Sequence, residues 1–289
     1  MILKSVKDNK VKSYFIISVF VIFVTLLIYF ICDYFLNLGY FSIFIAFLFS
    51  FVSAYASYYN SDKMVLSLNS ARKADPDEDK QLSDILDNLC IASGLPKPAL
   101  YIIDDDSPNA FSTGRDPEHA AICFTTGILK NLDKYELEGV MAHELSHIKN
   151  YDILLSTIVS VFVGMIVMLS DIFTRTRIRK SNDNANGILV ILGLFALVLS
   201  PIFATLMQLA ISRNREYLAD ASAVEITRNP KGLIDALRKL DENKEPLKEA
   251  NKATAHMYIV NPFKELNAET LFSTHPPIQK RIERLQNIQ

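Results

Sequence analysis

The sequence has no excess of positive charge: 30 Lys and Arg stand against 32 Asp and Glu, for a formal net charge of −2 over 289 residues. It therefore creates no broad basic field for nucleic-acid phosphates, and no Lys/Arg stripe with interleaved aromatic residues replaces one. Cysteine is also scarce, and the spacing of Cys32, Cys90 and Cys123 indicates neither a metal knuckle nor a redox pair. We expect no nucleic-acid partner and no cysteine chemistry.

Charged residues are also missing from four long apolar runs, although the remaining segments are rich in them. The runs cover residues 14–32, 40–59, 153–170 and 188–211, and none contains Asp, Glu, Lys or Arg. A helix needs about 20 apolar residues to cross a hydrocarbon core about 30 Å thick. The alternative is a set of buried helices in a soluble protein, but the complete absence of charge favours the membrane. We predict four transmembrane helices.

The flanking charges predict the orientation of these helices. The first run follows a short tail that contains four lysines, Lys4, Lys7, Lys10 and Lys12. Positive flanks tend to stay in the cytoplasm, so the N-terminus is predicted to lie inside. The basic loop 171–187 then faces outward against this tendency, but the first helix usually dominates the orientation. We expect a multi-pass protein of the cell (inner or plasma) membrane, embedded in the lipid bilayer.

A helix predicted after Asp133 carries a histidine pair within its apolar stripe. His143 and His147 are four residues apart, so both side chains project from the same side of a helix and can hold one zinc ion. Glu144 follows His143 and can reach the attacking water without being a ligand, which is the arrangement of the H-E-x-x-H motif. The motif also occurs by chance, and a histidine pair satisfied by hydrogen bonds is the alternative interpretation.

A second pair of polar residues has the same spacing. Glu216 and Asp220, on another predicted helix, offer a third metal ligand and a carboxylate that orients a ligand histidine through its other ring nitrogen. The alternative is a solvated charged face beside Arg213 and Arg215. Three protein ligands leave a fourth position for water, which is typical of a catalytic rather than a structural zinc site.

Four separated motifs extend this pattern over nearly the whole chain. They are His143-Glu144-Leu145-Ser146-His147 with Asp152, the segment Ser212 to Asp220, Thr274-His275-Pro276-Pro277 with Arg281, and Asn109-Ala110-Phe111-Ser112-Thr113-Gly114. Together they resemble the HtpX family of membrane zinc proteases, which is related to the prenyl-protein (CAAX) endopeptidases. Several separated motifs are far more specific than one.

The resemblance implies a role for each matched residue. Glu216 is expected to be the third ligand of one Zn²⁺ per subunit, with Asp220 and Asp152 as supporting residues. His275 and Arg281 are suggested as groups near the oxyanion, although a structural salt bridge is an equal alternative for Arg281. The resemblance also implies hydrolysis of peptide bonds in damaged membrane proteins, as part of quality control and the stress response.

In this interpretation Glu144 is the general base, which takes a proton from water and delivers it to the leaving amine. A peptide substrate must be held in an extended conformation, usually by an exposed edge strand. We predict such a strand at residues 121–125 and assign substrate binding to Asn109 and to this strand, namely Ala121, Ile122, Cys123, Phe124 and Thr125. Polypeptides bound through their main chain would be cleaved with weak sequence preference.

Three other functions stay open at this point. Two histidines and one carboxylate also describe the facial triad of non-haem iron oxygenases, although the neighbouring Glu144 favours hydrolysis. A membrane scaffold could keep a metal site without activity. A prenyl-protein endopeptidase shares all of the chemistry and differs only in its substrate.

The predicted fold is an α+β integral membrane protein with four transmembrane helices and a zincin-type cytosolic catalytic domain that has a small sheet and the H-E-x-x-H helix. The tail and the first membrane hairpin cover residues 1–60. The two halves of the catalytic domain cover 61–152 and 212–289, and the second membrane hairpin, 153–211, lies between them. Because the ligands come from both halves, both ends of the second hairpin must lie on one membrane face. At about 1.5 Å per helical residue, the zinc should lie within about 10 Å of the membrane surface.

Overall fold

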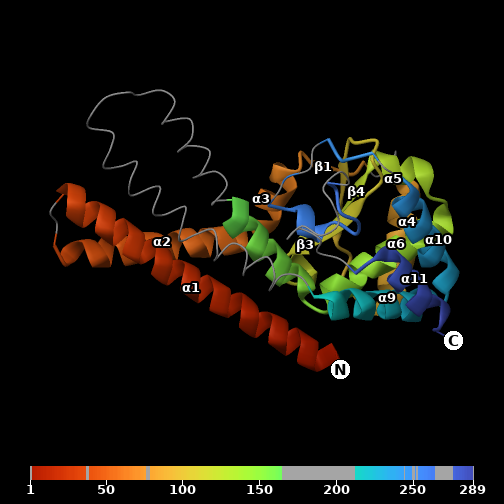
Figure 1. Ribbon diagram of the computed structural model, residues 1–289, viewed down its shortest axis with the longest axis horizontal. Coiled ribbons are helices and arrows are strands. Elements are labelled where there is room, and N and C mark those ends of the chain that lie inside the picture. The colour runs from red at the N-terminus through yellow and green to blue at the C-terminus, as the bar shows by residue number, and fades with distance from the viewer. Residues whose placement is uncertain are drawn as a thin grey trace.

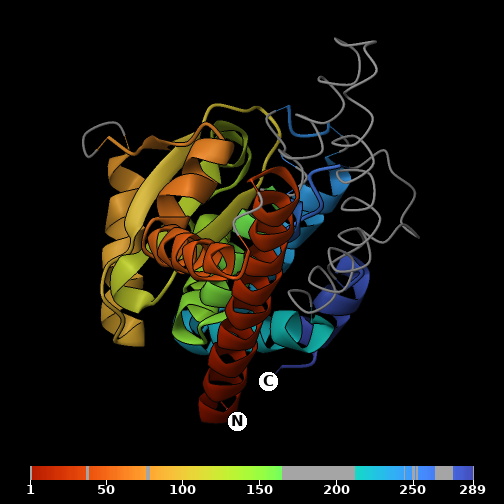
Figure 2. The same ribbon diagram turned by 90° about the vertical axis from the view of Figure 1, so that its left-hand side faces the viewer.

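The computed structural model describes residues 2–36, 39–75, 79–164, 212–243, 245–248, 251, 253–263 and 276–288. Two long helices, α1 and α2, project from a body of helices around a small sheet (Figure 1). The turned view looks along the hairpin towards the body, with the N-terminal end of α1 at the bottom (Figure 2).

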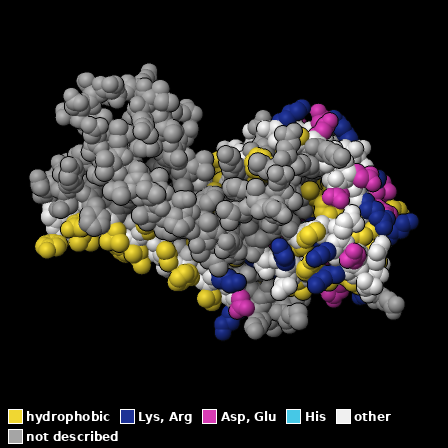
Figure 3. All heavy atoms as spheres, viewed as in Figure 1, with side chains coloured by type: hydrophobic (Ala, Val, Ile, Leu, Met, Phe, Trp, Pro, Cys, Tyr) yellow, Lys and Arg dark blue, Asp and Glu magenta, His cyan; other side chains and the backbone are white. Residues whose placement is uncertain are grey.

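Helices α1 (Ile2–Leu36) and α2 (Phe41–Tyr59) form a hairpin. The segment Val6–Leu26 and the whole of α2 are long and apolar enough to cross a membrane. The buried face of α2 repeats a small residue every fourth position, at Ser42, Ala46, Ser50 and Ala54, which lets two helices approach closely. Apolar side chains cover the outer faces of the hairpin, whereas charged ones gather on the body (Figure 3).

The structure reaches only part of the predicted second hairpin. A shorter apolar helix, Asp152–Gly164, covers the beginning of the third apolar run. The rest of that run, the basic loop 171–187 and the fourth run lie outside the described residues. Two helices of membrane-spanning length are therefore observed, and the prediction of four remains a prediction.

The sheet has four strands in the order β1-β2-β4-β3. Strand β2 (Ala99–Ile103) pairs in parallel with β4 (Ala120–Thr125), whereas β1 (Arg72–Lys73) and β3 (Ala110–Gly114) are antiparallel to their neighbours. Every residue of β3 and of β4 is buried. The outer position of β3 matters for the site, because an outer strand has one row of main-chain groups directed away from the sheet.

Helix α6 (Lys134–Lys149) lies at the centre of the body. It begins with a capping box in which the Asp133 carboxylate accepts from the Glu136 N–H and the Glu136 carboxylate accepts from the Asp133 N–H. Helix α6 contacts β3 and the helices α4 (Lys80–Ser93), α9 (Arg213–Thr227) and α10 (Pro230–Glu242).

The other helices of the body are α3 (Ser61–Leu68), α5 (Thr126–Asn131) and α11 (Ile278–Gln286). Short 3₁₀ turns lie at Pro117–His119 and Ala255–Met257.

One hydrophobic core joins the segments on both sides of residues 165–211. It contains Leu86, Ile122 and Leu145 from the first segment together with Leu237 and Ile282 from the second. Burial of apolar surface therefore holds α9, α10 and α11 against α6 and the sheet. This packing brings residues from both segments to one side of α6.

The contact between α6 and α10 depends on two glycines. A Cβ atom added at Gly139 would lie 2.7 Å from the Leu233 nitrogen, and one added at Gly232 would lie 2.4 Å from the Tyr135 oxygen. Because both obstacles are backbone atoms, the helices would have to separate. We expect Gly139→Ala to lower the free energy of unfolding by about 1–3 kcal/mol, measured by denaturant unfolding in detergent.

Gly164→Ala is the matched control for this prediction. A Cβ at Gly164 would meet only side-chain atoms, at 3.5 and 3.7 Å, so it has room. Alanine also has the higher helix propensity, so this variant should be unchanged or more stable by up to about 1 kcal/mol. Equal stability changes in the two variants would contradict the close helix contact.

Candidate active site

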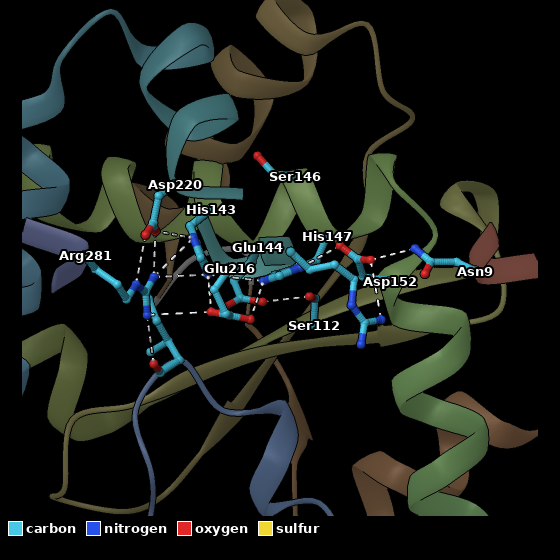
Figure 4. A network of polar contacts seen from close by, with 12 residues as sticks. Asn9, Ser112, His143, Glu144, Ser146, His147, Asp152, Glu216, Asp220 and Arg281 are labelled. Carbon is cyan, nitrogen blue, oxygen red and sulfur yellow. Dashed lines mark hydrogen bonds and ion pairs between the residues drawn. The ribbon is translucent and has the colours of Figure 1, made fainter. Parts of the chain in front are cut away.

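Three side chains from two helices converge beside α6 (Figure 4). His143 and His147 project from one face of α6 and their Nε2 atoms are 3.2 Å apart. Glu216, in the first turn of α9, directs both carboxylate oxygens at this pair: Oε2 lies 3.6 Å from Nε2 of His143, and Oε1 lies 3.6 Å from Nε2 of His147. One donor atom from each of the three residues lies within 4.8 Å of the others. The sequence spacing of four residues thus produces the predicted histidine pair, and the packing of α9 on α6 adds the carboxylate.

The size and chemistry of this cluster fit a zinc ion. Zinc is commonly held by histidine nitrogens at about 2.0–2.1 Å and carboxylate oxygens at about 2.0–2.2 Å in tetrahedral geometry, which separates neighbouring ligand atoms by about 3.3 Å. The observed separations of 3.2 and 3.6 Å match that value. His143, His147 and Glu216 could therefore hold the metal, with one position left for water.

Two aspartates orient the histidine rings from behind. The Nδ1 atom of His143 lies 3.0 Å from Asp220, and that of His147 lies 3.0 Å from Asp152. Each carboxylate accepts a hydrogen bond from its ring, which leaves Nε2 as the nitrogen directed at the cluster. The structure thus brings Asp220 and Asp152 to the positions expected of supporting residues.

Arg281 is bound to the supporting carboxylate of Asp220. Its Nε and Nη2 atoms donate to the two oxygens of Asp220 over 2.9 and 2.6 Å, and its Nη1 atom donates to the Ile259 carbonyl over 3.3 Å. The side chain is 0% exposed. Arg281 thus forms the structural salt bridge that was the alternative, and its Nη1 atom also lies 3.7 Å from the Glu216 carboxylate. Its role near the oxyanion stays a prediction.

Negative charge dominates the cluster. Burial opposes protonation of His143, but hydrogen bonds to Asp220 and Glu216 outweigh it and raise the pKa of His143 to about 9. Burial also opposes protonation of His147, yet the hydrogen bond to Asp152 raises its pKa. For Asp220, burial would raise the pKa, but Arg281 reverses the effect and lowers it. Surroundings that favour a cation on either histidine also favour a metal cation between them.

Glu144 lies next to the cluster without joining it. Its side chain is buried, and one carboxylate oxygen accepts a 2.6 Å hydrogen bond from the Ser112 hydroxyl of β3. Glu144 is not one of the three clustered donors. A carboxylate held beside the metal position, but outside the ligand set, is suitably placed to exchange protons with a water molecule there.

The strand beside Glu144 is β3, which corrects the prediction that residues 121–125 form an exposed edge. Those residues make up β4, which is paired with β2 on one side and with β3 on the other. Both rows of main-chain groups in an interior strand are engaged, so Ala121, Ile122, Cys123, Phe124 and Thr125 cannot pair with a substrate. Alternation of residue types could not reveal this, because strand order is decided by long-range pairing.

The outward main-chain groups of β3 are at alternate residues. The Asn109 carbonyl is directed at β4, where it accepts a hydrogen bond from the Thr125 N–H. The Ala110 carbonyl and the Gly114 N–H are directed away from β4: the first accepts from the Ile259 N–H, and the second donates to the Thr157 hydroxyl. Because the direction alternates along a strand, Ser112 also directs its N–H and C=O away from β4. The residue that contacts Glu144 through its hydroxyl is thus the one that presents its main chain beside the site.

Asn109 has a structural role rather than the expected contact with substrate. Its side-chain amide donates to the Val260 carbonyl over 2.9 Å and its side-chain oxygen accepts from the Ala110 N–H over 3.1 Å. The residue is 0% exposed and its side-chain amide is engaged within the fold, so this side chain is not offered to a substrate. The other predicted oxyanion group, His275, lies outside the described residues.

Sequence reasoning overlooked two polar contacts at the site. Ser112 lies within the recognised stretch around Asn109, but nothing in its position indicated a hydrogen bond to Glu144. Asn9, in the lysine-rich tail, donates a 2.7 Å hydrogen bond to Asp152. No sequence signal could have found that contact, because the two residues are 143 positions apart.

Comparison with known proteins agrees with this geometry. Residues 76–289 match the model of peptidase family M48. The chain is 46% identical over 285 residues to a protease HtpX homolog of Dictyoglomus thermophilum, covering 98% of this chain and 93% of that one. It is 42% identical over 299 residues to a protease HtpX homolog of Lactobacillus helveticus, with both chains covered completely.

A solved structure shows the same fold. The crystal structure of S. mikatae Ste24p superposes with a TM-score of 0.50 at 19% identity, covering 98% of this chain and 67% of that chain. The resemblance to the HtpX family drawn from the separated motifs is confirmed by the relatives, and a prenyl-protein activity is not favoured. The chain therefore belongs to peptidase family M48, as an HtpX-type membrane metalloendopeptidase.

Proposed function

We propose that this endopeptidase depends on one zinc ion per chain and cleaves damaged or misfolded membrane proteins at the cytoplasmic face. The observation that supports the metal is the convergence of His143, His147 and Glu216 within 4.8 Å. Glu144 is a further carboxylate beside the cluster, but it is not one of the three clustered donors. Non-haem iron would use the same three ligands, but it would have no need of this additional buried carboxylate.

The side chains around the metal have separate tasks in peptide hydrolysis. Zinc would supply a Lewis acid and lower the pKa of a water molecule towards about 7. Glu144 takes the proton from that water and returns it to the leaving amine, while Ser112 holds the Glu144 carboxylate in place. Asp220 and Asp152 keep the two histidine rings oriented, and Arg281 holds Asp220.

We propose that the substrate pairs with β3 at Ser112. Main-chain pairing with an outer strand holds an extended peptide largely independently of its side chains. That arrangement supports the weak sequence preference useful for removing damaged proteins of many sequences. His147 and Glu216 keep side-chain exposures of 14% and 11%, whereas His143 has 1%, so access to the metal position is from their side.

The membrane location supports the choice of substrate. Asn9, which contacts the site, lies five residues before Tyr14, where the first apolar run begins. At about 1.5 Å per residue this is about 7.5 Å along α1, consistent with a site close to the membrane surface. The four lysines before the run favour placing this end in the cytoplasm.

Metal removal tests the proposed function directly. Full-length protein purified in detergent should contain equimolar zinc and cleave an unfolded casein-like substrate. A chelator should stop cleavage, and added zinc should restore it. His147→Ala should lose both zinc and activity, because the two remaining ligands, His143 and Glu216, would hold the ion poorly.

His119→Ala is the matched control, since this histidine is 47% exposed and hydrogen-bonded to Asp116 rather than to the site. It should keep zinc and activity. Iron in place of zinc would support an oxygenase. Equimolar zinc without cleavage of any substrate would support the inactive scaffold, and either outcome would refute the proposal.

A further inference from the structure

The first membrane helix reaches the metal cluster through Asn9. This residue is 2% exposed, and its side-chain amide donates to the Asp152 carboxylate over 2.7 Å and to the Asn150 carbonyl over 3.1 Å. The other oxygen of Asp152 lies 3.0 Å from Nδ1 of His147. Figure 4 shows the resulting line of contacts from Asn9 through Asp152 to His147.

Asn9 engages the turn that joins α6 to the next helix. Within this turn Tyr151 has a φ angle of 59°, in the left-handed region that bulky residues avoid. Such a conformation persists only where its surroundings hold it in place. Lys10 contributes a second contact, with its ammonium 3.9 Å from the centre of the Tyr151 ring. Asn9 therefore contacts the residues on both sides of the strained position, and Lys10 contacts the strained residue itself.

The length of α1 explains how a membrane helix reaches this turn. Its 35 residues span about 50 Å at 1.5 Å per residue, whereas the hydrocarbon core needs about 30 Å. Within Val6–Leu26 the apolar, charge-free run begins at Tyr14, so the lysine-rich turns before it can lie outside the hydrocarbon core and carry Asn9 to the body. A buried amide is costly without partners, and those of Asn9 are both in the turn that follows α6.

We propose that Asn9 is a positioning residue of the metal site. It fixes the Asp152 carboxylate, which orients the imidazole of His147, so that α1 is a component of the metal centre as well as an anchor. This inference depends on the proposed function, because it requires zinc at His147. Asn9 itself contacts neither the metal position nor the substrate strand.

Zinc affinity of the full-length protein in detergent, measured by chelator competition, tests this role. Asn9→Leu keeps the size of the side chain and removes its hydrogen-bond donors. We expect zinc affinity to fall roughly tenfold, at the lower end of the range for partners behind a ligand. The absorption spectrum of the cobalt-substituted protein should also change, because it reports the ligand geometry directly. Asn9→Gln, which keeps the amide, should recover part of the affinity.

Thr25→Val is the matched control on the same helix. Thr25 is buried and its hydroxyl bonds only to the Val21 carbonyl in the contacts observed, far along α1 from the turn. This variant should keep the wild-type zinc affinity and cobalt spectrum. Should Asn9→Leu fail to fold, Asn9→Ala removes the same donors without adding apolar bulk.

A double-variant experiment distinguishes action through Asp152 from a separate effect. If Asn9 acts through Asp152, adding Asn9→Leu to Asp152→Asn should lower zinc affinity little further than Asp152→Asn alone. Multiplicative losses would overturn the inference, as would an Asn9→Leu protein that is less stable yet binds zinc with unchanged affinity and spectrum. Wild-type protein without zinc would instead refute the proposed function, and this inference with it.

Discussion

Glu144→Gln should lower the rate of peptide cleavage by about 10²–10⁴-fold, while the protein keeps its zinc. The amide cannot accept the proton of the attacking water, so the step assigned to Glu144 is lost. Its size and shape are almost the same, and its oxygen can still accept the 2.6 Å hydrogen bond from Ser112. The metal cluster should be intact, because Glu144 is not one of its three members.

The measurement is cleavage of an unfolded substrate, or of the protein itself, beside zinc content, for both proteins purified in parallel. Glu138→Gln is the matched control: it makes the same change on α6, at a residue outside the cluster. It should cleave at the wild-type rate. Cleavage by Glu144→Gln at more than about a tenth of that rate would rule out Glu144 as the general base.

Arg281→Leu should lower the free energy of unfolding by about 3–5 kcal/mol. The substitution leaves the Asp220 carboxylate buried without the guanidinium that donates to both of its oxygens. Burial then acts on Asp220 without opposition from Arg281 and raises its pKa from the lowered value it has beside the arginine. Unfolding by denaturant, followed by circular dichroism in detergent, measures the loss.

Arg284→Leu provides the comparison on the same helix. Arg284 is exposed and lies 3.7 Å from the ring centre of Tyr217, a contact worth about 0.5–1 kcal/mol. Adding Asp220→Asn to Arg281→Leu should recover part of the stability, because the unpaired charge disappears. Nearly equal losses for Arg281→Leu and Arg284→Leu would contradict the buried ion pair.

Local sequence rules were sufficient wherever neighbouring residues decide the structure. Charge-free runs coincide with the long apolar helices α1 and α2, because the hydrophobic content of a segment is a property of that segment alone. The spacing of four residues places His143 and His147 on one side of α6, since the helical repeat fixes their relative direction. Recognition of the family followed from the same short motifs, and the relatives confirm it.

Contacts between distant segments decided the features that local sequence rules could not predict. Residues 121–125 have the composition of a strand, but their interior position comes from pairing with both β2 and β3. The charge of Arg281 suited an oxyanion or an ion pair equally, and the observed ion pair forms because α11 meets an aspartate 61 positions earlier. In both cases the structure depends on which distant segment the residues contact, and local propensity carries no information about such contacts.

The sequence by itself determined the two long apolar helices, the histidine pair with its neighbouring glutamate, and membership of the protease family. Only the tertiary structure decided that β3 is the strand beside Glu144, that Arg281 supports Asp220, and that Asn9 reaches Asp152. The physical reason is range. Helix periodicity and hydropathy act within a few residues, whereas the core that brings α6, α9, α11 and the sheet together is built from segments far apart along the chain.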